Sequence, residues 1–436
     1  MKKEISTFKS YMFSLRFVIA NSNAPVILSL CFLILFSNCN TSKKAASQSV
    51  TDASLVFDPG QTYATNRIPA LVMTNNGTLL AFCEGRLSGS GDWAAIDILM
   101  RRSTDKGKTW EDVKTLVAHN PEKPPTSNAT PIIDKSGVVH FLYQRNYERA
   151  YYINSADDGK TWSEPIDITY VFEKFRDKYN WKVLAPGPGH AIQLRTGRLL
   201  VPIWLCEPMK GAPGGDHRPS CIATIYSDDA GKTWQAGDII TNNGDLAAGN
   251  SIPIVNPSEN VAIELSDGRV MLNMRTESLN NKRLISYSAD GATNWTKPVF
   301  DDELYDPVCM ASLVRISGNG DNDRNRILFV NPDSHTNPKV LNKVNFRTRE
   351  NLTARLSYDE GENWTVQKVL WPGIAGYSDV AVGKDGTIYC LYETRDDTPV
   401  DTTKTTDRNN FRKFGVVIKK FNLEWLTDGK DKWSKK

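Results

Sequence analysis

An eight-residue pattern, Ser-x-Asp-x-Gly-x-Thr-Trp, recurs along this 436-residue chain and constrains its fold more than any other feature. In such a unit the Ser and Asp side chains bond the amides of their own turn, Gly allows a positive φ, and Trp packs beneath a neighbouring strand. The pattern therefore predicts a recurring hairpin turn. Three copies are complete and two are weaker, with Asn in place of Thr in both and Ala in place of Gly in the second: 103–110, 155–162, 227–234, 357–364 and 288–295.

The spacing of the copies predicts the architecture. They begin 52, 72, 61 and 69 residues apart, which suits units of four short strands with their loops, as in a propeller blade. About 370 residues in units of roughly 62 give six blades. Helical periodicity is nearly absent, and only 170–179 suits a short helix, so we expect an all-β fold, a six-bladed β-propeller. Strand-like runs lie before, between and after the copies, and many directly follow an Asp-Gly, Asn-Gly or Thr-Gly turn. They are at 79–82, 138–143, 198–204, 269–274, 326–330 and 387–392.

The sixth blade lacks an octapeptide and needs another way to close the ring. We expect a strand at 53–57 to pair with a strand at 414–421, which leaves no open sheet edge. The propeller then spans 53–430 and follows a linker at 39–52. Taken alone, the repeat indicates a propeller, and both binding modules and hydrolases use that architecture.

Residues 1–38 have the features of an export signal. Four cations precede an uncharged apolar run at 24–36, which is too short for a comfortable membrane span. The stretch 35–39 resembles a lipoprotein cleavage site, after which Cys39 would be the lipidated first residue; the alternatives are an uncleaved anchor and a cut elsewhere. We expect an exported protein, located in the periplasm, at the outer membrane with a lipid anchor at Cys39, or outside the cell.

Charge and cysteine content bear on the partners. The net charge of +3 belongs to the first 38 residues, which hold four cations and one acid, so the remainder is neutral and gives no reason to expect nucleic acid or anionic lipid. Five scattered cysteines follow Cys39 without Cys-x-x-Cys spacing, which indicates neither a disulfide framework nor a zinc site. Only Cys206 and Cys221 bracket a loop tightly enough to suspect a bridge. We expect no metal, no organic cofactor and no obligate protein partner.

Three short motifs contain an arginine: Tyr-Ala-Thr-Asn-Arg-Ile-Pro-Ala-Leu around Arg67, Val-Met-Leu-Asn-Met-Arg ending at Arg275, and Arg-Glu-Asn-Leu-Thr starting at Arg349. They resemble the arginine motifs of the sialidase (neuraminidase) family, with Asn66 where that family usually has Phe or Tyr. The resemblance implies that the three arginines bind the carboxylate of the substrate. Planar guanidiniums that converge on one place suit a carboxylate, whereas each arginine alone suits an exposed strand residue or a surface ion pair.

Two further stretches extend this resemblance. Glu-Gly-Arg ending at Arg86, followed by Asp92, resembles the family segment with a further arginine and the catalytic aspartate. Asp92 would protonate the leaving oxygen and then activate water; the alternative is a turn former, with Asp97 as competitor. Glu393, at the end of an apolar run, resembles the family glutamate that orients the first arginine, here Arg67.

A tyrosine and a glutamate complete the expected set. Gly-Tyr-Ser around Tyr377 resembles the nucleophile motif of the family, and Glu259, 16 residues before Arg275, matches its partner. A carboxylate nucleophile would be repelled by the carboxylate of the sugar, whereas a phenol with a pKa of about 10 approaches freely but needs a base. The alternatives are a core aromatic at Tyr377 and an ordinary loop carboxylate at Glu259, with Glu264 nearby.

Four other residues lie near these motifs. His190 follows Gly-Pro-Gly in a stretch that resembles one flanking the aglycone side of the family's pocket, and we assign it no chemistry. Trp93, Trp204 and Met310 are candidate walls for the N-acetyl and glycerol arms of a sialic acid, with core packing as the alternative.

The resemblance covers the chain from about residue 53 to its end and implies a retaining exo-α-sialidase. Tyr377 would attack the anomeric carbon, and water activated by Asp92 would resolve the sialyl-tyrosine intermediate, which removes terminal α-linked sialic acid from glycoproteins, glycolipids and oligosaccharides. The same residues suit two other outcomes, transfer to another sugar and intramolecular release of an anhydro product. A sialic-acid-binding propeller without turnover is the non-enzymatic alternative.

Overall fold

The computed structural model describes residues 53–60, 62–89, 91–208, 217–318, 324–335, 347–395 and 414–434. The described residues form antiparallel β sheets and two short helices, α1 (Thr169–Glu173) and α2 (Leu423–Leu426). The all-β class is therefore confirmed. The helix expected at 170–179 is the one-turn α1, which begins one residue earlier and ends six residues sooner, although turn-type hydrogen bonds continue as far as Tyr179.

Four sheets have the size of a single blade. In three of them all consecutive strands lie side by side, as expected for strands joined by short hairpins, and in the remaining one the first two strands both pair with the third. Their strands are β2 (Thr65–Met73), β3 (Leu79–Arg86), β4 (Ile96–Ser103) and β5 (Lys114–Val117); β6 (Thr126–Ile133), β7 (Val139–Arg145), β8 (Arg149–Ser155) and β9 (Ile166–Asp167); β10 (Val183–Pro186), β11 (Ile192–Gln193), β12 (Leu199–Cys206), β13 (Ser220–Ser227) and β14 (Gln235–Asn242); and β15 (Asn260–Glu264), β16 (Val270–Met274), β17 (Lys282–Ser288) and β18 (Val299–Tyr305).

The fifth sheet has seven strands, so the described strands do not form the six separate sheets that were expected. The reason is the 17-residue length of β22. Its part from Val366 to Ile374 pairs with β21, and its part from Ala375 to Val382 pairs with β23. The sheet contains β1 (Ser54–Phe57), β24 (Phe414–Phe421), β23 (Ile388–Arg395), β22 (Val366–Val382), β21 (Glu350–Ser357), β20 (Arg326–Pro332) and β19 (Ser312–Ser317).

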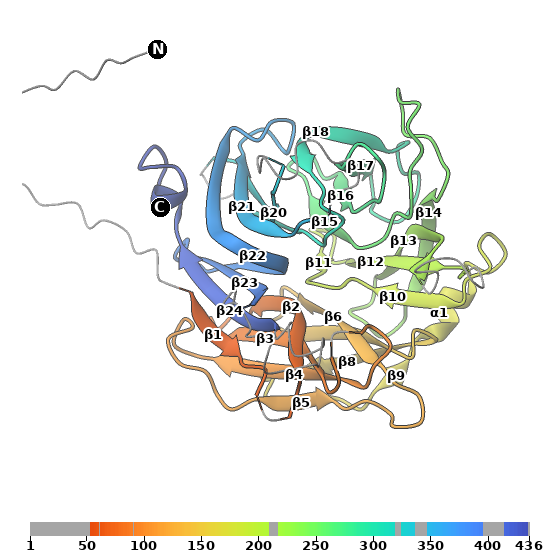
Figure 1. The fold of residues 1–436 in the computed structure, drawn as a ribbon, viewed down its shortest axis with the longest axis horizontal. Helices are drawn as coiled ribbons and strands as arrows, with labels where there is room; N and C mark the ends of the chain where they lie inside the picture. Colours follow the sequence, from red (N-terminus) through yellow and green to blue (C-terminus); the bar gives the residue numbers. More distant parts are fainter. Residues whose placement is uncertain are drawn as a thin grey trace, which may run out of the picture. The chain divides into compact units, whose positions relative to one another are not determined.

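The innermost strands contact one another in a closed series. β2 contacts β6 and β22, β6 contacts β11, β11 pairs with β12, β12 contacts β15, and β19 contacts both β15 and β22. Figure 1 shows the sheets arranged around a common centre, near which β2, β6, β11, β15 and β22 lie. This propeller-like arrangement brings the first residues of several strands to the same region of the molecule.

The octapeptide copies form the predicted turns. In the first copy Ser103 Oγ accepts a hydrogen bond from the amide of Gly107 at 2.8 Å, and Asp105 accepts bonds from the hydroxyl and amide of Thr109. Gly107 has φ +71°, in the region that favours glycine. Each copy starts at the last residue of β4, β8, β13, β17 or β21, so the motif ends the third strand of a four-strand group and leads into the fourth.

The expected closure of the ring is also present. β1 pairs with β24, with Leu55 opposite Val417, and the buried Phe57 packs in a core cluster with residues of β2, β3, β23 and β24. The first described strand is thereby held next to the last and covers the edge that β24 would otherwise present.

Cys206 and Cys221 lie on the paired strands β12 and β13, but both are free, buried thiols, and the suspected bridge is absent. The register explains this. Cys221 pairs with Leu205 and Cys206 with Ser220, so the two cysteines are offset by one residue and point to opposite faces of the sheet.

The predicted signal peptide at 1–38, the lipid anchor at Cys39 and the linker at 39–52 lie outside the described residues. Within the described part of the chain, neither helix has the length and apolar character that a membrane span requires.

Candidate functional site

Charged side chains from distant motifs meet at one cavity of about 300 Å³. The cavity draws residues from β2, β3 and β22 and from the segments that flank β15, β16 and β21. The expected catalytic and arginine residues line it, whereas Glu393 lies directly behind Arg67; of the candidate walls, Trp204 lines the cavity and Trp93 and Met310 do not. The lining includes Arg67, Arg86, Asp92, Glu259, Arg275, Arg349 and Tyr377.

Glu393 fixes the orientation of Arg67. Nε and Nη2 of Arg67 donate to the two oxygens of Glu393 at 3.0 and 2.9 Å, and the amides of Ile68 and Tyr377 donate to the same carboxylate. Burial alone would raise the pKa of Glu393, but Arg67 and these hydrogen bonds hold it below its usual value. A Cβ on Gly376 would lie 2.1 Å from Oε1 of Glu393, so this close approach requires glycine.

Tyr377 and Glu259 form a hydrogen-bonded pair beneath Arg275. The hydroxyl of Tyr377 donates to Oε1 of Glu259, and Nη1 of Arg275 donates to the tyrosine oxygen at 2.7 Å and to Oε2 of Glu259. Burial raises the pKa of Tyr377 well above its usual value, although Arg275 opposes the shift. The phenol is therefore neutral at physiological pH and needs a base to become a nucleophile.

Three guanidiniums converge around the ring of Tyr377. Cζ of Arg67 lies 5.6 Å and Cζ of Arg349 lies 5.2 Å from the ring centroid, and Arg275 reaches the hydroxyl. Arg349 also donates to the carbonyl of Val308. The arrangement concentrates positive charge in a small cavity, which favours a bound anion.

The backbone beside two of these arginines is strained. Ile68, next to Arg67, has φ +56°, and Val308, whose carbonyl accepts from Arg349, has φ +59°. β-branched residues rarely adopt this left-handed region, and such strain clusters at functional sites. The bulge between Arg67 and Ala70 in β2 lies at the same place and aims Arg67 inward.

Arg86 connects a buried carboxylate to an accessible one. It donates to Oε2 of Glu84 from Nε at 3.1 Å and from Nη2 at 2.7 Å, and its Nη1 donates to Oδ1 of Asp92 at 2.8 Å. The Asp92 side chain is 46% exposed, so it can meet a ligand. Desolvation would raise the pKa of Asp92, but Arg86 and Arg67 hold it below its usual value.

The two competing carboxylates lie elsewhere. Asp97 accepts from Tyr63 Oη at 2.7 Å and from the amide of His119, outside the cavity. Glu264 is bound by Arg195 and lines a different cavity. The structure therefore brings Asp92 and Glu259 to the arginines and keeps their sequence neighbours away.

An aromatic wall flanks Asp92. The ring centroid of Trp93 lies 4.7 Å from that of Tyr147 and 5.6 Å from that of His217, and Trp204 lies 5.3 Å from His217. Met310 packs against Ile68 and Tyr377 in a small buried cluster.

Several lining residues were not predicted from the sequence: Tyr147, His217, Arg218, Asn256, Glu277 and Arg347. Two of them carried a usable signal, since Glu277 follows Arg275 by two positions and Arg347 precedes Arg349 by two. The others reach the cavity from segments with no recognisable pattern.

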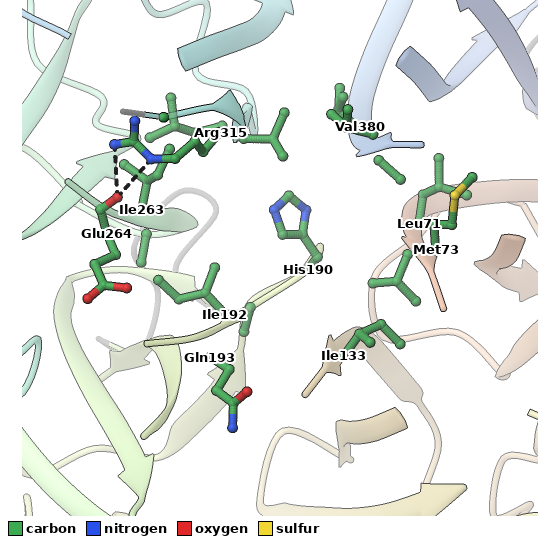
Figure 2. Close-up of a pocket in the computed structure, with 18 of the residues that line it drawn as sticks. Leu71, Met73, Ile133, His190, Ile192, Gln193, Ile263, Glu264, Arg315 and Val380 are labelled. Atoms are coloured by element: carbon green, nitrogen blue, oxygen red, sulfur yellow. Dashed lines mark hydrogen bonds between the residues drawn. The ribbon is translucent and has the colours of Figure 1, made fainter. Parts of the chain in front are cut away.

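A second, larger cavity of about 580 Å³ lies among the inner strands and contains a single histidine. Figure 2 shows the imidazole of His190 surrounded by apolar side chains such as Leu71 and Val380, with Arg315 at one edge donating to the carbonyl of Glu264. Its lining holds no tyrosine, cysteine or lysine nucleophile. The chemistry therefore favours the smaller cavity as the functional site.

His190 has a structural partner. Its Nδ1 lies 2.6 Å from Oδ1 of the buried Asp379, which also accepts from the amides of His190 and Leu71 and from the hydroxyl of Ser312. Burial would lower the pKa of His190, but Asp379 raises it above its usual value. Within the described ranges, no group of three His, Cys, Asp or Glu side chains could hold a metal ion.

Comparison with known proteins identifies relatives. A family model described as a BNR repeat-like domain matches residues 77–390. A sialidase of Micromonospora viridifaciens is 30% identical over 407 residues, 86% of this chain and 54% of the relative. A sialidase of Bacteroides fragilis (strain YCH46) is 28% identical over 368 residues, 76% of this chain and 60% of the relative. The chain thus spans 54% and 60% of the lengths of these two relatives.

Solved structures show the same fold. The Hadza microbial sialidase Hz136 matches with a TM-score of 0.66 at 25% identity, over 86% of this chain and 69% of that one. A Trypanosoma rangeli sialidase with 2,3-difluorosialic acid as a covalent intermediate matches with a TM-score of 0.64 at 18% identity, over 86% and 59%. A leech intramolecular trans-sialidase with 2,7-anhydro-Neu5Ac matches with a TM-score of 0.64 at 16% identity, over 87% and 71%.

Proposed function

The chain belongs to the sialidase family with BNR repeats, and from this premise we propose that it is a retaining exo-α-sialidase that hydrolyses terminal α-linked sialic acid from glycans. One observation carries the proposal. The hydroxyl of Tyr377 donates to Glu259 inside a ring of three arginines. A phenol that is hydrogen-bonded to a carboxylate base and surrounded by guanidiniums suits a sugar that carries a carboxylate on its anomeric carbon.

Binding is the first step of the proposed reaction. The carboxylate of sialic acid lies between Arg67, Arg275 and Arg349, whose planar donors suit it. Glu393 holds Arg67 in place through two hydrogen bonds. With the carboxylate fixed, the anomeric carbon that bears it is held within reach of Tyr377.

Formation of the intermediate is the second step. Glu259 accepts the phenolic proton, and the tyrosine oxygen bonds to the anomeric carbon as the glycosidic bond breaks. Asp92 gives its proton to the leaving oxygen. In the free protein Arg86 and Arg67 lower the pKa of Asp92. The carboxylate of the bound substrate offsets the positive charge of Arg67, so the pKa of Asp92 rises and its carboxyl can carry the proton that it donates.

Hydrolysis is the third step. Water reaches the anomeric carbon from the side vacated by the leaving sugar, and Asp92, now a carboxylate, accepts a proton from it. The bond to Tyr377 breaks and the tyrosine recovers its proton from Glu259. Two inversions at one carbon give net retention.

Six blades are the proposed interpretation of the sheets. The two halves of β22 pair with different neighbours, which supports two four-stranded blades that share one strand. With the four blade-sized sheets, this gives the six that the repeat spacing predicts.

We further propose that residues 1–38 export the protein and that residues 53–430 form the catalytic propeller. A lipid at Cys39 would place it at the outer membrane, and cleavage without lipidation would place it in the periplasm or outside the cell. Mass spectrometry of the N-terminal peptide from the mature protein distinguishes these states, and an intact N-terminus on a cytoplasmic protein would contradict export.

Time-resolved NMR with 3′-sialyllactose tests the proposed function. The purified protein should release α-sialic acid first, and Tyr377→Phe and Asp92→Ala should slow release by orders of magnitude. First appearance of the β-anomer would contradict retention, an anhydro product would indicate intramolecular transfer, and binding without cleavage would indicate a lectin-like protein.

A further inference from the structure

Two arginines share one carboxylate at the edge of the candidate site. Arg218 donates from Nε and Nη2 to Glu277, with distances of 2.6 to 3.0 Å, and Nη2 of Arg347 donates to Oε2 of Glu277 at 2.8 Å. The amide of Asn256 also reaches Glu277 at 3.3 Å. We name Arg218, Glu277 and Arg347 the rim cluster; all three line the cavity that holds Tyr377.

The rim cluster is adjacent to the arginine triad, which consists of Arg67, Arg275 and Arg349. Glu277 is two residues after Arg275, and Arg347 is two residues before Arg349. The Arg275 side chain is 12% exposed, whereas that of Arg347 is 48% exposed. Arg347 is thus nearer to the mouth of the cavity, in the direction in which the rest of a glycan must extend, while Glu277 is 10% exposed and as buried as Arg275.

The rim cluster carries an excess of positive charge. Two guanidiniums face one carboxylate, which leaves a net charge of +1. Desolvation would raise the pKa of Glu277, but Arg218, Arg347 and Arg275 hold it below its usual value, so the carboxylate stays ionised. One arginine would neutralise Glu277, so two around one carboxylate leave an excess of positive charge that suits an anion.

The covalent structure of a sialoside places its second sugar close to the rim cluster. The carboxylate and the glycosidic oxygen of sialic acid are on the same anomeric carbon. When the triad holds the carboxylate, the leaving sugar therefore begins one bond from a carbon fixed beside Arg275 and Arg349. Glu277 and Arg347 line the same cavity as that pair and as Asp92, the acid assigned to the leaving oxygen, so they are within the region that the next sugar must cross.

We propose that the rim cluster is an aglycone subsite in which Arg347 and Arg218, held by Glu277, bind an anionic group on the sugar that precedes the terminal sialic acid. Such a group is a carboxylate, when that sugar is itself a sialic acid, or a sulfate ester. The inference rests on the proposed function, since it names a preferred substrate class for the same site.

Kinetics with three substrates test the subsite. The first is 3′-sialyllactose, with a neutral second sugar; the second is an α2,8-linked disialyl-lactose; the third is a sialyl-lactosamine sulfated on its galactose. Arg347→Gln should lower kcat/KM for at least one anionic substrate about tenfold more than for 3′-sialyllactose, as expected from loss of a charge-assisted hydrogen bond. Arg347→Lys, which keeps the charge, should restore part of the difference.

The matched control is Arg195→Gln. Arg195 also pairs with a glutamate, Glu264, and is 57% exposed, but it lines the other cavity. This variant should treat all three substrates as the parent protein does. Whichever anionic substrate loses more identifies the group as carboxylate or sulfate, and added salt should reduce the preference.

Equal losses for neutral and anionic substrates in Arg347→Gln and in Arg218→Gln would overturn the subsite. If the parent protein cleaves none of the three, the proposed function fails, and calorimetric binding of the same sugars still tests the rim cluster. Tighter binding of an anionic sugar that Arg347→Gln abolishes would support it, and equal affinities would overturn it.

Discussion

The hydroxyl of Tyr377 donates a hydrogen bond to Oε1 of Glu259, although 118 residues separate the two in the chain. Arg275 donates to both members of the pair. Burial keeps the pKa of Tyr377 high, so a base in direct contact is a requirement of nucleophilic attack, and the first prediction concerns that base.

Glu259→Gln should lower kcat by about 10²- to 10⁴-fold, the range for loss of a general base. KM for 3′-sialyllactose should change little because Arg67, Arg275 and Arg349 remain. Steady-state kinetics check this, with Glu264→Gln as the control, since Glu264 lies at the other cavity. A Glu259→Gln protein with near-normal kcat would contradict the assignment.

The pH dependence should differ between free and bound protein. Arg86 and Arg67 hold the pKa of Asp92 low in the free protein. Asp92 therefore loses its proton at acidic pH, and kcat/KM should begin to decline there as pH rises. The carboxylate of a bound substrate offsets the positive charge near Asp92, which raises its pKa in the complex. The decline of kcat should therefore occur at higher pH than that of kcat/KM. Coincident profiles in the two parameters would contradict this account.

Glu393→Gln should act mainly through substrate binding. The variant keeps the size of the side chain but loses the charge that holds Arg67 at 2.9 Å, so KM should rise by about 10- to 100-fold, as for a charge-assisted hydrogen bond. The effect on kcat should be smaller. Binding of a sialic acid analogue measured by calorimetry checks the assignment, and an unchanged affinity would refute it.

The pair of His190 and Asp379 should make stability depend on pH. Asp379 raises the pKa of His190, so the stabilising contribution is fully present below the ordinary histidine pKa and is lost as pH rises through the raised value. The thermal midpoint should fall over that interval. His190→Asn offers an amide N–H to Asp379 without titrating, so its midpoint should depend less on pH. Identical pH dependence in both proteins would show that other groups cause the change.

Local patterns in the sequence predicted much of the fold. The octapeptide contains its own turn hydrogen bonds, and strand-like runs such as 387–392 follow short turns, so both depend on residues close in the chain. The pairing of 53–57 with 414–421 followed from the need to close the ring. The length of β22 did not, because its two halves have different partners, and pairing across the molecule leaves no local pattern.

The residues of the candidate site could also be predicted only in part from local patterns in the sequence. Motifs indicated Arg67, Asp92 and Tyr377, and the structure brings them to one cavity, while their chemical roles remain predictions. The sequence left Asp97 and Glu264 open as competitors, and only the folded chain separates them from the arginines. Contacts such as that of Arg218 with Glu277 join segments 59 residues apart, so residue type and spacing alone could not reveal them.

Peptide mapping after incubation with 2,3-difluorosialic acid tests whether Tyr377 is the nucleophile. Tyr377 should bond to the anomeric carbon as fluoride leaves, with the phenolic proton passing to Glu259, and the remaining fluorine should slow hydrolysis by opposing positive charge at that carbon. The account predicts an adduct on Tyr377 that is absent from Tyr377→Phe. An adduct on another residue, or turnover of sialyllactose by Tyr377→Phe at a near-normal rate, would contradict it.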